Sequence, residues 1–124
     1  MRPIFTEAAP KPVGPYSQAV LSGFTVYGSG QIAINPETGL MVQDSIEAET
    51  QQVIDNIEAV LAEARMGLEN VVKATIFLTD INDFAAVNAV YGKAFPEHSP
   101  ARSCVQVAAL PKGARVEIEY IATK

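Results

Sequence analysis

The 124-residue chain is almost without cysteine and histidine, with one residue of each. A single cysteine excludes an intrachain disulfide and a cysteine-built zinc site, and with a single histidine we expect no metal centre. Long apolar runs are also missing: nothing approaches the ~20 residues that a membrane-spanning helix needs, and the N-terminal run MRPIFTEAAPKP lacks the apolar segment of a signal peptide. We therefore expect a cytoplasmic protein with neither a metal nor a membrane partner.

Positive charge is scarce as well. Nine Lys and Arg residues stand against fourteen Asp and Glu residues, which gives a net charge of -5. The cations are scattered, and an acidic chain repels phosphate backbones, so no nucleic-acid partner is expected. The 48% hydrophobic and 19% charged composition is that of a globular protein. The length suits one hydrophobic core, and we expect a single domain over residues 1–124.

Hydrophobic periodicity predicts a mixture of strands and helices. The expected strands lie within residues 19–34 and at 71–79, 102–110 and 114–122, and the expected helices at 46–64 and 80–95. For the first helix, Asp44 is the expected N-cap, Gly67 the expected left-handed C-cap, and Glu49 falls on the polar side. The order β-β-β-α-β-α-β-β indicates an α+β domain, with both helices on one face of a mostly antiparallel sheet.

The predicted sheet has a second face, which the helices do not cover. Charged residues alternate with apolar ones in the last strand, so Glu117 and Glu119 should lie on the face away from the helices. The same alternation in the preceding strand places Arg102 and Cys104 on the corresponding face. Together with Phe77 they make a helix-free face that is either open to water or buried against another subunit. We regard it as a candidate surface for oligomerisation.

An amide interrupts the apolar stripe of the second helix. Asn88 lies one turn after Phe84 and beside Tyr91. A buried amide must be hydrogen-bonded. A structural tie to a loop carbonyl is the commoner role for such a residue, and a role in a functional site is the rarer one; the spacing leaves both open.

Four runs of the sequence carry a family resemblance. They are GPYSQAV from Gly14, GSGQIAINPETG from Gly28, VVKATIFLTDINDFAAVNAVYGKAF from Val71 and PARSCVQVAALPKGARVEIEYIA from Pro100. In this order and spacing they resemble the Rid family of reactive-intermediate deaminases, also called the RidA or YjgF group. The resemblance implies a chorismate-mutase-like fold and a homotrimer with three equivalent clefts between subunits.

The same resemblance implies an activity in metabolite damage control: hydrolysis of 2-imino or enamine acids, such as 2-iminopropanoate and 2-iminobutanoate, to 2-oxo acids and ammonia. The residues that match the family's site are Tyr16, Ser29, Asn88, Arg102, Cys104 and Glu117. The sequence departs from the family at Tyr120, where many members have Ala, and the loop PEHSPARS looks shorter than in some members. Both departures bear on substrate size.

Two of the matching residues have roles that follow from their chemistry. Arginine binds a carboxylate through two parallel N–H bonds, so Arg102 is the expected clamp for the substrate carboxylate, with Asn88 bonding the substrate or holding Arg102. Imine hydrolysis adds water to the C=N carbon and delivers a proton to nitrogen, and Glu117 is the expected carboxyl for this exchange, with Glu119 as its competitor. A partly desolvated cleft would raise the Glu117 pKa. No cofactor is expected.

The other matching residues are expected to shape the cleft. A nucleophilic thiol needs a base beside it, and the only histidine, His98, lies in a loop with no reason to face Cys104. Cys104 is therefore expected to line the pocket, while Tyr16 and Ser29 close the cleft and order water.

Two further functions stay open at the level of the sequence. The same cleft could belong to a binding or regulatory module that only captures 2-oxo acids and related carboxylates, because a clamp does not prove turnover. Glu117 favours catalysis, since a pure carboxylate binder has no use for a second carboxylate. An endoribonuclease is a distant third reading because of the acidic charge.

Overall fold

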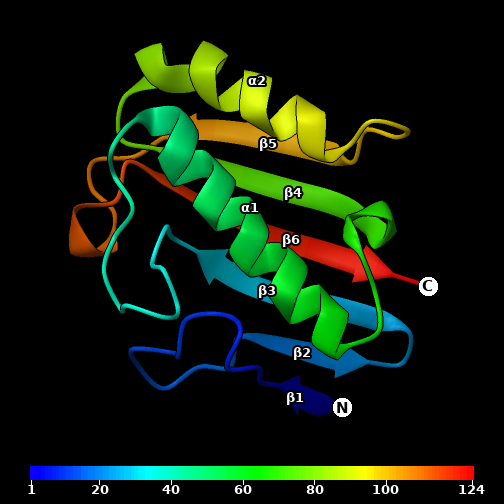
Figure 1. The fold of residues 1–124 in the computed structure, drawn as a ribbon. Coiled ribbons are helices and arrows are strands. Elements are labelled where there is room, and N and C mark those ends of the chain that lie inside the picture. The colour runs from blue at the N-terminus through cyan, green and yellow to red at the C-terminus, as the bar shows by residue number, and fades with distance from the viewer.

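The computed structural model describes residues 1–124 and contains a sheet with two α-helices. The order of elements, β-β-β-α-β-α-β-β, agrees with the expected one (Figure 1), but the first strand lies at residues 2–4 and not within the expected range 19–34. The strands are β1 (Arg2–Ile4), β2 (Ala19–Ser22), β3 (Thr25–Gln31), β4 (Val71–Leu78), β5 (Ala101–Gln106) and β6 (Val116–Thr123), and the helices are α1 (Ile46–Glu63) and α2 (Phe84–Ala94). The predicted α+β class is confirmed.

The six-stranded sheet has the order β1-β2-β3-β6-β4-β5. Neighbouring strands are antiparallel except β4 and β5, which run parallel, so the sheet is mostly antiparallel as predicted. A parallel pair needs a crossover connection, and α2 supplies it between β4 and β5. The β2–β3 hairpin turns at Gly23, whose φ of 62° is a left-handed conformation that glycine adopts without strain.

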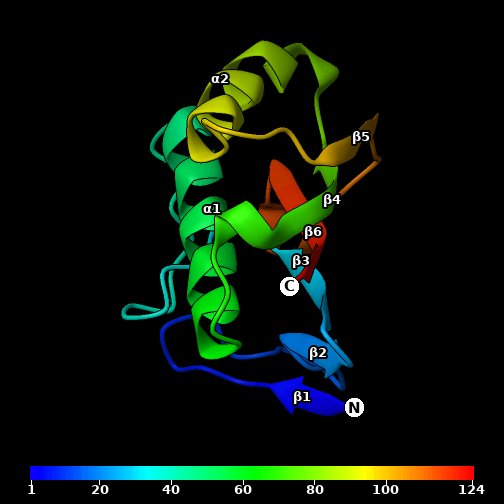
Figure 2. The same cartoon turned by 90° about the vertical axis from the view of Figure 1, so that its right-hand side faces the viewer.

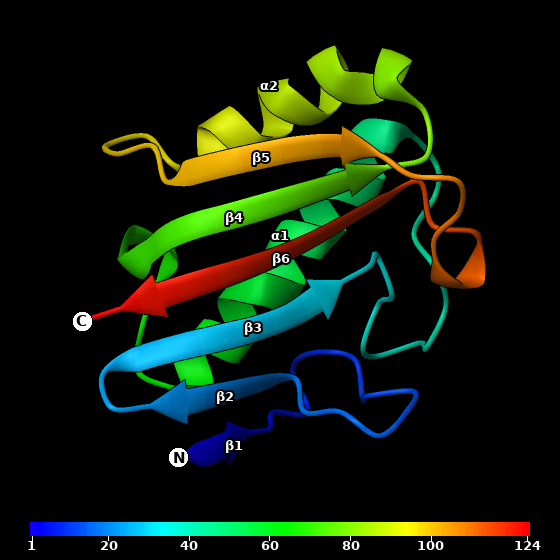
Figure 3. The same cartoon turned by 180° about the vertical axis from the view of Figure 1, so that it is seen from behind.

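The two helices lie on the same side of the sheet, as Figure 2 shows. Helix α1 packs on β6 and β3, and α2 packs beside α1. Seen from behind, the other face of the sheet carries no helix (Figure 3). Neither helix has the length and apolar composition that crossing a bilayer requires.

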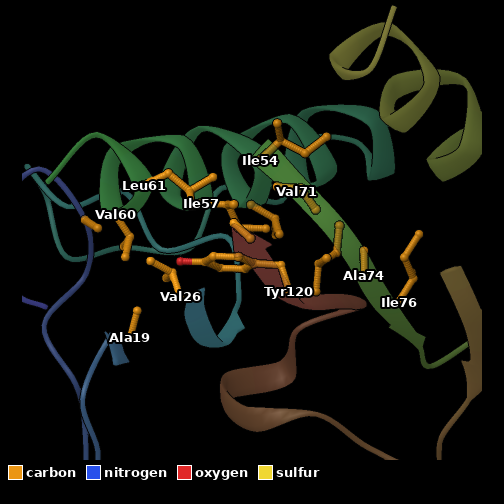
Figure 4. Close-up of a cluster of buried hydrophobic side chains, with 14 of the residues drawn as sticks. Ala19, Val26, Ile54, Ile57, Val60, Leu61, Val71, Ala74, Ile76 and Tyr120 are labelled. Atoms are coloured by element: carbon orange, nitrogen blue, oxygen red, sulfur yellow. The ribbon is translucent and has the colours of Figure 1, made fainter. Parts of the chain in front are cut away.

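The hydrophobic core fills the space between α1 and the covered face of the sheet (Figure 4). Helix α1 contributes Val53, Val60 and Leu61, which are completely buried because the apolar residues of this helix recur on one face. Tyr120 of β6 points into the same cluster and is 3% exposed, and its hydroxyl has no hydrogen-bond partner. Its side chain is therefore a core residue.

The ends of α1 differ from the sequence prediction. The N-cap is Ser45, whose side chain accepts a hydrogen bond from the Ala48 N–H, and not Asp44. Gly67 has an extended backbone with φ of -130°, and Arg65 takes the left-handed conformation instead, with φ of 58°. The reason is that the helix ends at Glu63, so the left-handed residue comes two positions before Gly67.

Glu49 was expected on the polar side of α1 and is instead completely buried. Its carboxylate accepts hydrogen bonds from the Arg115 Nε at 2.8 Å and from the Arg115 backbone N–H at 2.7 Å. A buried carboxylate with a charged partner and a backbone donor has its hydrogen-bonding capacity used, which offsets the cost of burial. The ion pair anchors the chain directly before β6, two residues from Glu117.

The helix-free face is only partly the one that the alternation predicted. Phe77 pairs with Glu117 on that face. Arg102 and Cys104, however, pair with Ala74 and Ile76 of β4, whose side chains are buried beneath the helices, so both residues lie on the covered side. The prediction was wrong because it treated the last two strands as neighbours in the sheet.

The strand order explains that error. β6 inserts between β3 and β4, which leaves β5 at the edge beside β4 alone. The register of β5 is therefore set by β4, and it exposes Val105, whose side chain is 44% accessible, on the helix-free face. The side chains of β5 alternate as predicted, but Arg102 and Cys104 lie on the covered face and Val105 on the helix-free face, the reverse of the prediction.

Candidate functional site

The first candidate pocket lies where β5 runs beside α2. Its lining residues are Asn88, Tyr91, Gly92, Phe95, Ser99, Pro100 and Arg102. The parallel crossover brings the side chains of α2 over the start of β5, so residues distant in the sequence meet here. We call this the arginine pocket.

The guanidinium of Arg102 is fixed by three side chains of α2. Its Nη1 donates a hydrogen bond of 2.6 Å to Asn88 Oδ1. Its central carbon lies 4.9 Å from the ring centre of Tyr91 and 5.6 Å from that of Phe84. Asn88 is exposed rather than buried. Of its two expected roles, the structure supports the one in which it holds Arg102.

Cys104 lies two residues along β5 from Arg102 and packs against the core. Burial raises the pKa of its thiol, and the nearby Arg102 charge offsets only part of this effect. A thiol with a raised pKa is a poor nucleophile. His98 bonds the Val71 carbonyl through Nε2 and packs against Phe95, so it is engaged elsewhere.

The second candidate pocket lies between the N-terminal loop, the end of β3 and the start of β6. Its lining residues are Pro10, Lys11, Val13, Tyr16, Gln18, Gly30, Gln31, Ile32, Ile34, Pro111 and Glu117. Glu117 supplies the only carboxylate in the lining. We call this the glutamate pocket.

The carboxyl of Glu117 is partly buried in this pocket. Burial raises its pKa above the usual value for a glutamate, and the neighbouring Glu119 carboxylate raises it further. Gly30 provides the room, because a Cβ at this position would overlap the Glu117 carboxylate. Acid–base work favours such a raised pKa, since it moves the group toward working pH.

Hydrogen bonds from Gln18 and Ser29 stabilise the loop that carries Tyr16. Gln18 is 2% exposed, and its amide donates to the carbonyls of Thr6 and Pro10 and accepts from the Thr6 N–H. The Ser29 hydroxyl donates a hydrogen bond of 2.6 Å to the Ser17 carbonyl, so Ser29 supports the loop. Tyr16 itself is 49% exposed at the pocket.

Sequence reasoning missed Gln18. Its signal was available: a long polar side chain stands directly before the apolar run of β2, where burial requires that its amide be hydrogen-bonded. Tyr120, where the sequence departs from the family, was expected to affect substrate size, and the structure places it elsewhere. Tyr120 belongs to the core and lines neither the arginine pocket nor the glutamate pocket.

The six expected site residues thus form two groups within one chain. Asn88, Arg102 and Cys104 lie at or near the arginine pocket, and Tyr16, Ser29 and Glu117 at or near the glutamate pocket. The register places Arg102 on the covered side of the sheet and Glu117 on the helix-free side. The arginine pocket does not include Glu117, and the glutamate pocket does not include Arg102.

Comparison with known proteins places these features in a family. The model for the family described as Endoribonuclease L-PSP matches residues 6–124. The chain belongs to this family, the Rid (RidA/YjgF) family. The resemblance in the sequence is thereby confirmed.

Relatives within the Rid family match over nearly their whole length. A RutC family protein of Pyrococcus abyssi is 52% identical over 98% of this chain and 95% of its own length. A 2-iminobutanoate/2-iminopropanoate deaminase of Capra hircus is 51% identical over 99% of this chain and 90% of its own length. The crystal structure of E. coli TdcF with bound serine has a TM-score of 0.95, is 42% identical, and covers 100% of this chain and 99% of the TdcF chain.

Proposed function

We propose that this Rid-family protein hydrolyses reactive 2-imino and enamine acids, such as 2-iminopropanoate and 2-iminobutanoate, to 2-oxo acids and ammonia, without a cofactor. The deaminase of Capra hircus, at 51% identity, supports this activity. The residues of the two pockets supply its requirements: a cation that binds a carboxylate and a carboxyl with a raised pKa.

One observation carries the proposal furthest: Arg102 and Glu117 lie in separate pockets on opposite faces of the sheet. A reaction that uses both residues therefore needs two copies of the chain. We propose a homotrimer in which the arginine pocket of one subunit meets the glutamate pocket of the next. Such a head-to-tail contact closes into a ring and yields three equivalent clefts.

Arg102 would bind the substrate carboxylate. Its guanidinium donates one N–H to Asn88, which leaves further N–H groups for a bidentate contact with the carboxylate. The carboxylate bound in this way fixes the adjacent C=N carbon relative to the facing subunit. Positioning of this kind lowers the barrier by removing the search for the reactive geometry.

Glu117 would exchange the protons. In its ionised form it takes a proton from a water molecule while the water oxygen forms a bond to the C=N carbon. The protonated carboxyl then gives that proton to the nitrogen, which produces a carbinolamine. Glu117 next takes the proton of the new hydroxyl and delivers it to the amino nitrogen; the carbon–nitrogen bond breaks with its electron pair leaving on ammonia, and the carbonyl forms. Water and imine are consumed, and a 2-oxo acid and ammonia are released, with Glu117 returned to its starting state.

Imine clearance tests this proposal. We would generate 2-iminobutanoate in situ, let semicarbazide compete for it, and compare the wild type with Arg102→Ala and Glu117→Gln. We expect the wild type to outcompete the trap and each variant to lose at least about 10²-fold in rate, Glu117→Gln because an acid–base group is removed and Arg102→Ala because the substrate carboxylate is no longer held. Arg2→Ala and Glu37→Gln, which remove the same charges at exposed positions, serve as controls with unchanged clearance.

A carboxylate-binding module is the second candidate, because the similar TdcF structure holds bound serine. The two functions separate in the same experiment. A wild type that clears no imine, but binds 2-oxobutanoate through Arg102, would be a binding module and would overturn the hydrolase proposal.

A further inference from the structure

The guanidinium of Arg102 lies against two aromatic rings that the proposed reaction does not use. Phe84 and Tyr91 stand on the same side of α2 as Asn88, at positions i, i+7 and i+4 of the helix. The rings lie 5.6 Å and 4.9 Å from the central carbon of Arg102, within the range of cation–π attraction. One helix face therefore supplies the hydrogen bond and both cation–π contacts of this guanidinium.

We propose that Phe84 and Tyr91 are positioning residues that hold the plane of the Arg102 guanidinium for the substrate carboxylate. This inference rests on the proposed function of Arg102 as the carboxylate clamp. It assigns a role in carboxylate binding to two residues that lie outside the six-residue site.

The hydrogen bond and the ring contacts make different demands on the guanidinium. A guanidinium binds oxygen acceptors at its N–H edge and aromatic rings at its faces. Asn88 accepts one N–H, while the Tyr91 and Phe84 rings lie within cation–π range of the central carbon. The remaining edge donors stay available for a carboxylate, and the cation loses side-chain freedom before the substrate arrives.

The two rings are expected to contribute unequally. Tyr91 is 7% exposed and Phe84 is 37% exposed, so the inner contact is shielded from water and the outer one is not. Cation–π attraction is stronger at desolvated sites. The Tyr91 hydroxyl has no hydrogen-bond partner, so the ring and not the hydroxyl carries the effect.

Four variants test the inference through steady-state kinetics on 2-iminobutanoate. We expect Tyr91→Leu to raise KM by about three- to tenfold and Phe84→Leu by about twofold, with kcat within about twofold, since the rings act on carboxylate binding. Tyr91→Phe keeps the ring and should retain the wild-type KM. Val87→Ala is the matched control: Val87 is 1% exposed on α2, so the variant weakens helix packing without touching Arg102.

A readout without turnover separates this inference from the proposed reaction. The Arg102 Nε–H resonance should show a ring-current shift in the wild type and in Tyr91→Phe, and this shift should shrink in Tyr91→Leu. An unchanged resonance in Tyr91→Leu, or an equal rise of KM in Val87→Ala, overturns the positioning role. If the shift responds as expected while the wild type clears no imine, the positioning of Arg102 by the rings stands and the hydrolase proposal fails.

Discussion

The arginine pocket and the glutamate pocket prepare their charged groups in different ways. Arg102 is held by side chains: an amide at its edge and two rings beside it, all from α2. Glu117 depends on its surroundings: Gly30 leaves room for its carboxylate, and burial by the surrounding loop raises its pKa. The cation is oriented by contacts, whereas the acid is tuned by its surroundings.

This difference suits the two proposed roles. A clamp must present its donors in a fixed plane, and side-chain contacts provide that orientation. A proton-exchanging carboxyl must have a suitable pKa, and partial burial beside a like charge provides it. Damage to the first pocket should therefore be seen mainly in binding, and damage to the second mainly in the proton transfers.

Inactivating the two pockets in different subunits tests most directly whether they form one shared cleft. Arg102→Ala and Glu117→Ala should each be inactive, yet a co-refolded equal mixture should recover about a quarter of the wild-type clearance, because a quarter of the head-to-tail contacts in a random trimer join two intact pockets. Imine clearance measured on the mixture, with native mass spectrometry to count mixed trimers, checks this expectation.

Refolding two variants that are both altered at Glu117 provides the control. Glu117→Ala refolded with Glu117→Gln contains no intact glutamate pocket and should stay inactive. Mixed trimers of Arg102→Ala and Glu117→Ala that recover no activity would contradict a cleft shared between subunits.

A smaller effect should follow from filling the space beside Glu117. Gly30→Ala places a methyl group where the Glu117 carboxylate lies, so the carboxylate must move. We expect kcat to fall by about tenfold, a modest share of what general acid–base catalysis contributes. The affinity for 2-oxobutanoate, measured by calorimetry, should stay within about twofold, because Arg102 is untouched.

The two measurements on Gly30→Ala must disagree for the comparison to hold. A variant that loses affinity for 2-oxobutanoate as strongly as it loses kcat would show that the pockets do not act separately.

How far the sequence predicts this structure can be judged from the same residues. Periodicity found both helices and five of the six strands, because the apolar faces of α1 and β6 are buried against one another, and it missed the three-residue β1, which is too short to show alternation. It could not find the neighbours of β5, because alternation defines two faces of a strand without saying which one meets the core. Arg102 was therefore assigned to the face of Glu117, and only the β4 register corrects this.

The site shows the same limit at the level of single side chains. The family motifs located the matching residues, yet they could not show that Ser29 supports a loop carbonyl or that Tyr120 enters the core. Glu49 looked solvated because its partner, Arg115, is distant in the sequence. Pairing across such distances depends on tertiary packing, which no local pattern records.

The smallest expected effect concerns the charge beside Glu117. The Glu119 carboxylate raises the Glu117 pKa, and burial raises it more. Glu119→Gln removes the like charge, so the Glu117 pKa should fall while staying above the usual value for a glutamate. Because ionised Glu117 is the proposed base, the acid limb of the kcat/KM profile should move to lower pH in this variant.

The ionisation of the substrate affects the wild type and Glu119→Gln equally, so it does not contribute to the difference between their profiles. As a control, Glu37→Gln removes the same charge from an exposed turn and should leave the acid limb of the kcat/KM profile in place. A limb that stays put in Glu119→Gln, or moves to higher pH, would mean that another group sets the profile. A shift to lower pH, with 2-oxobutanoate affinity at neutral pH unchanged, would show that the acid is tuned through its surroundings while the clamp is set by contacts of its own.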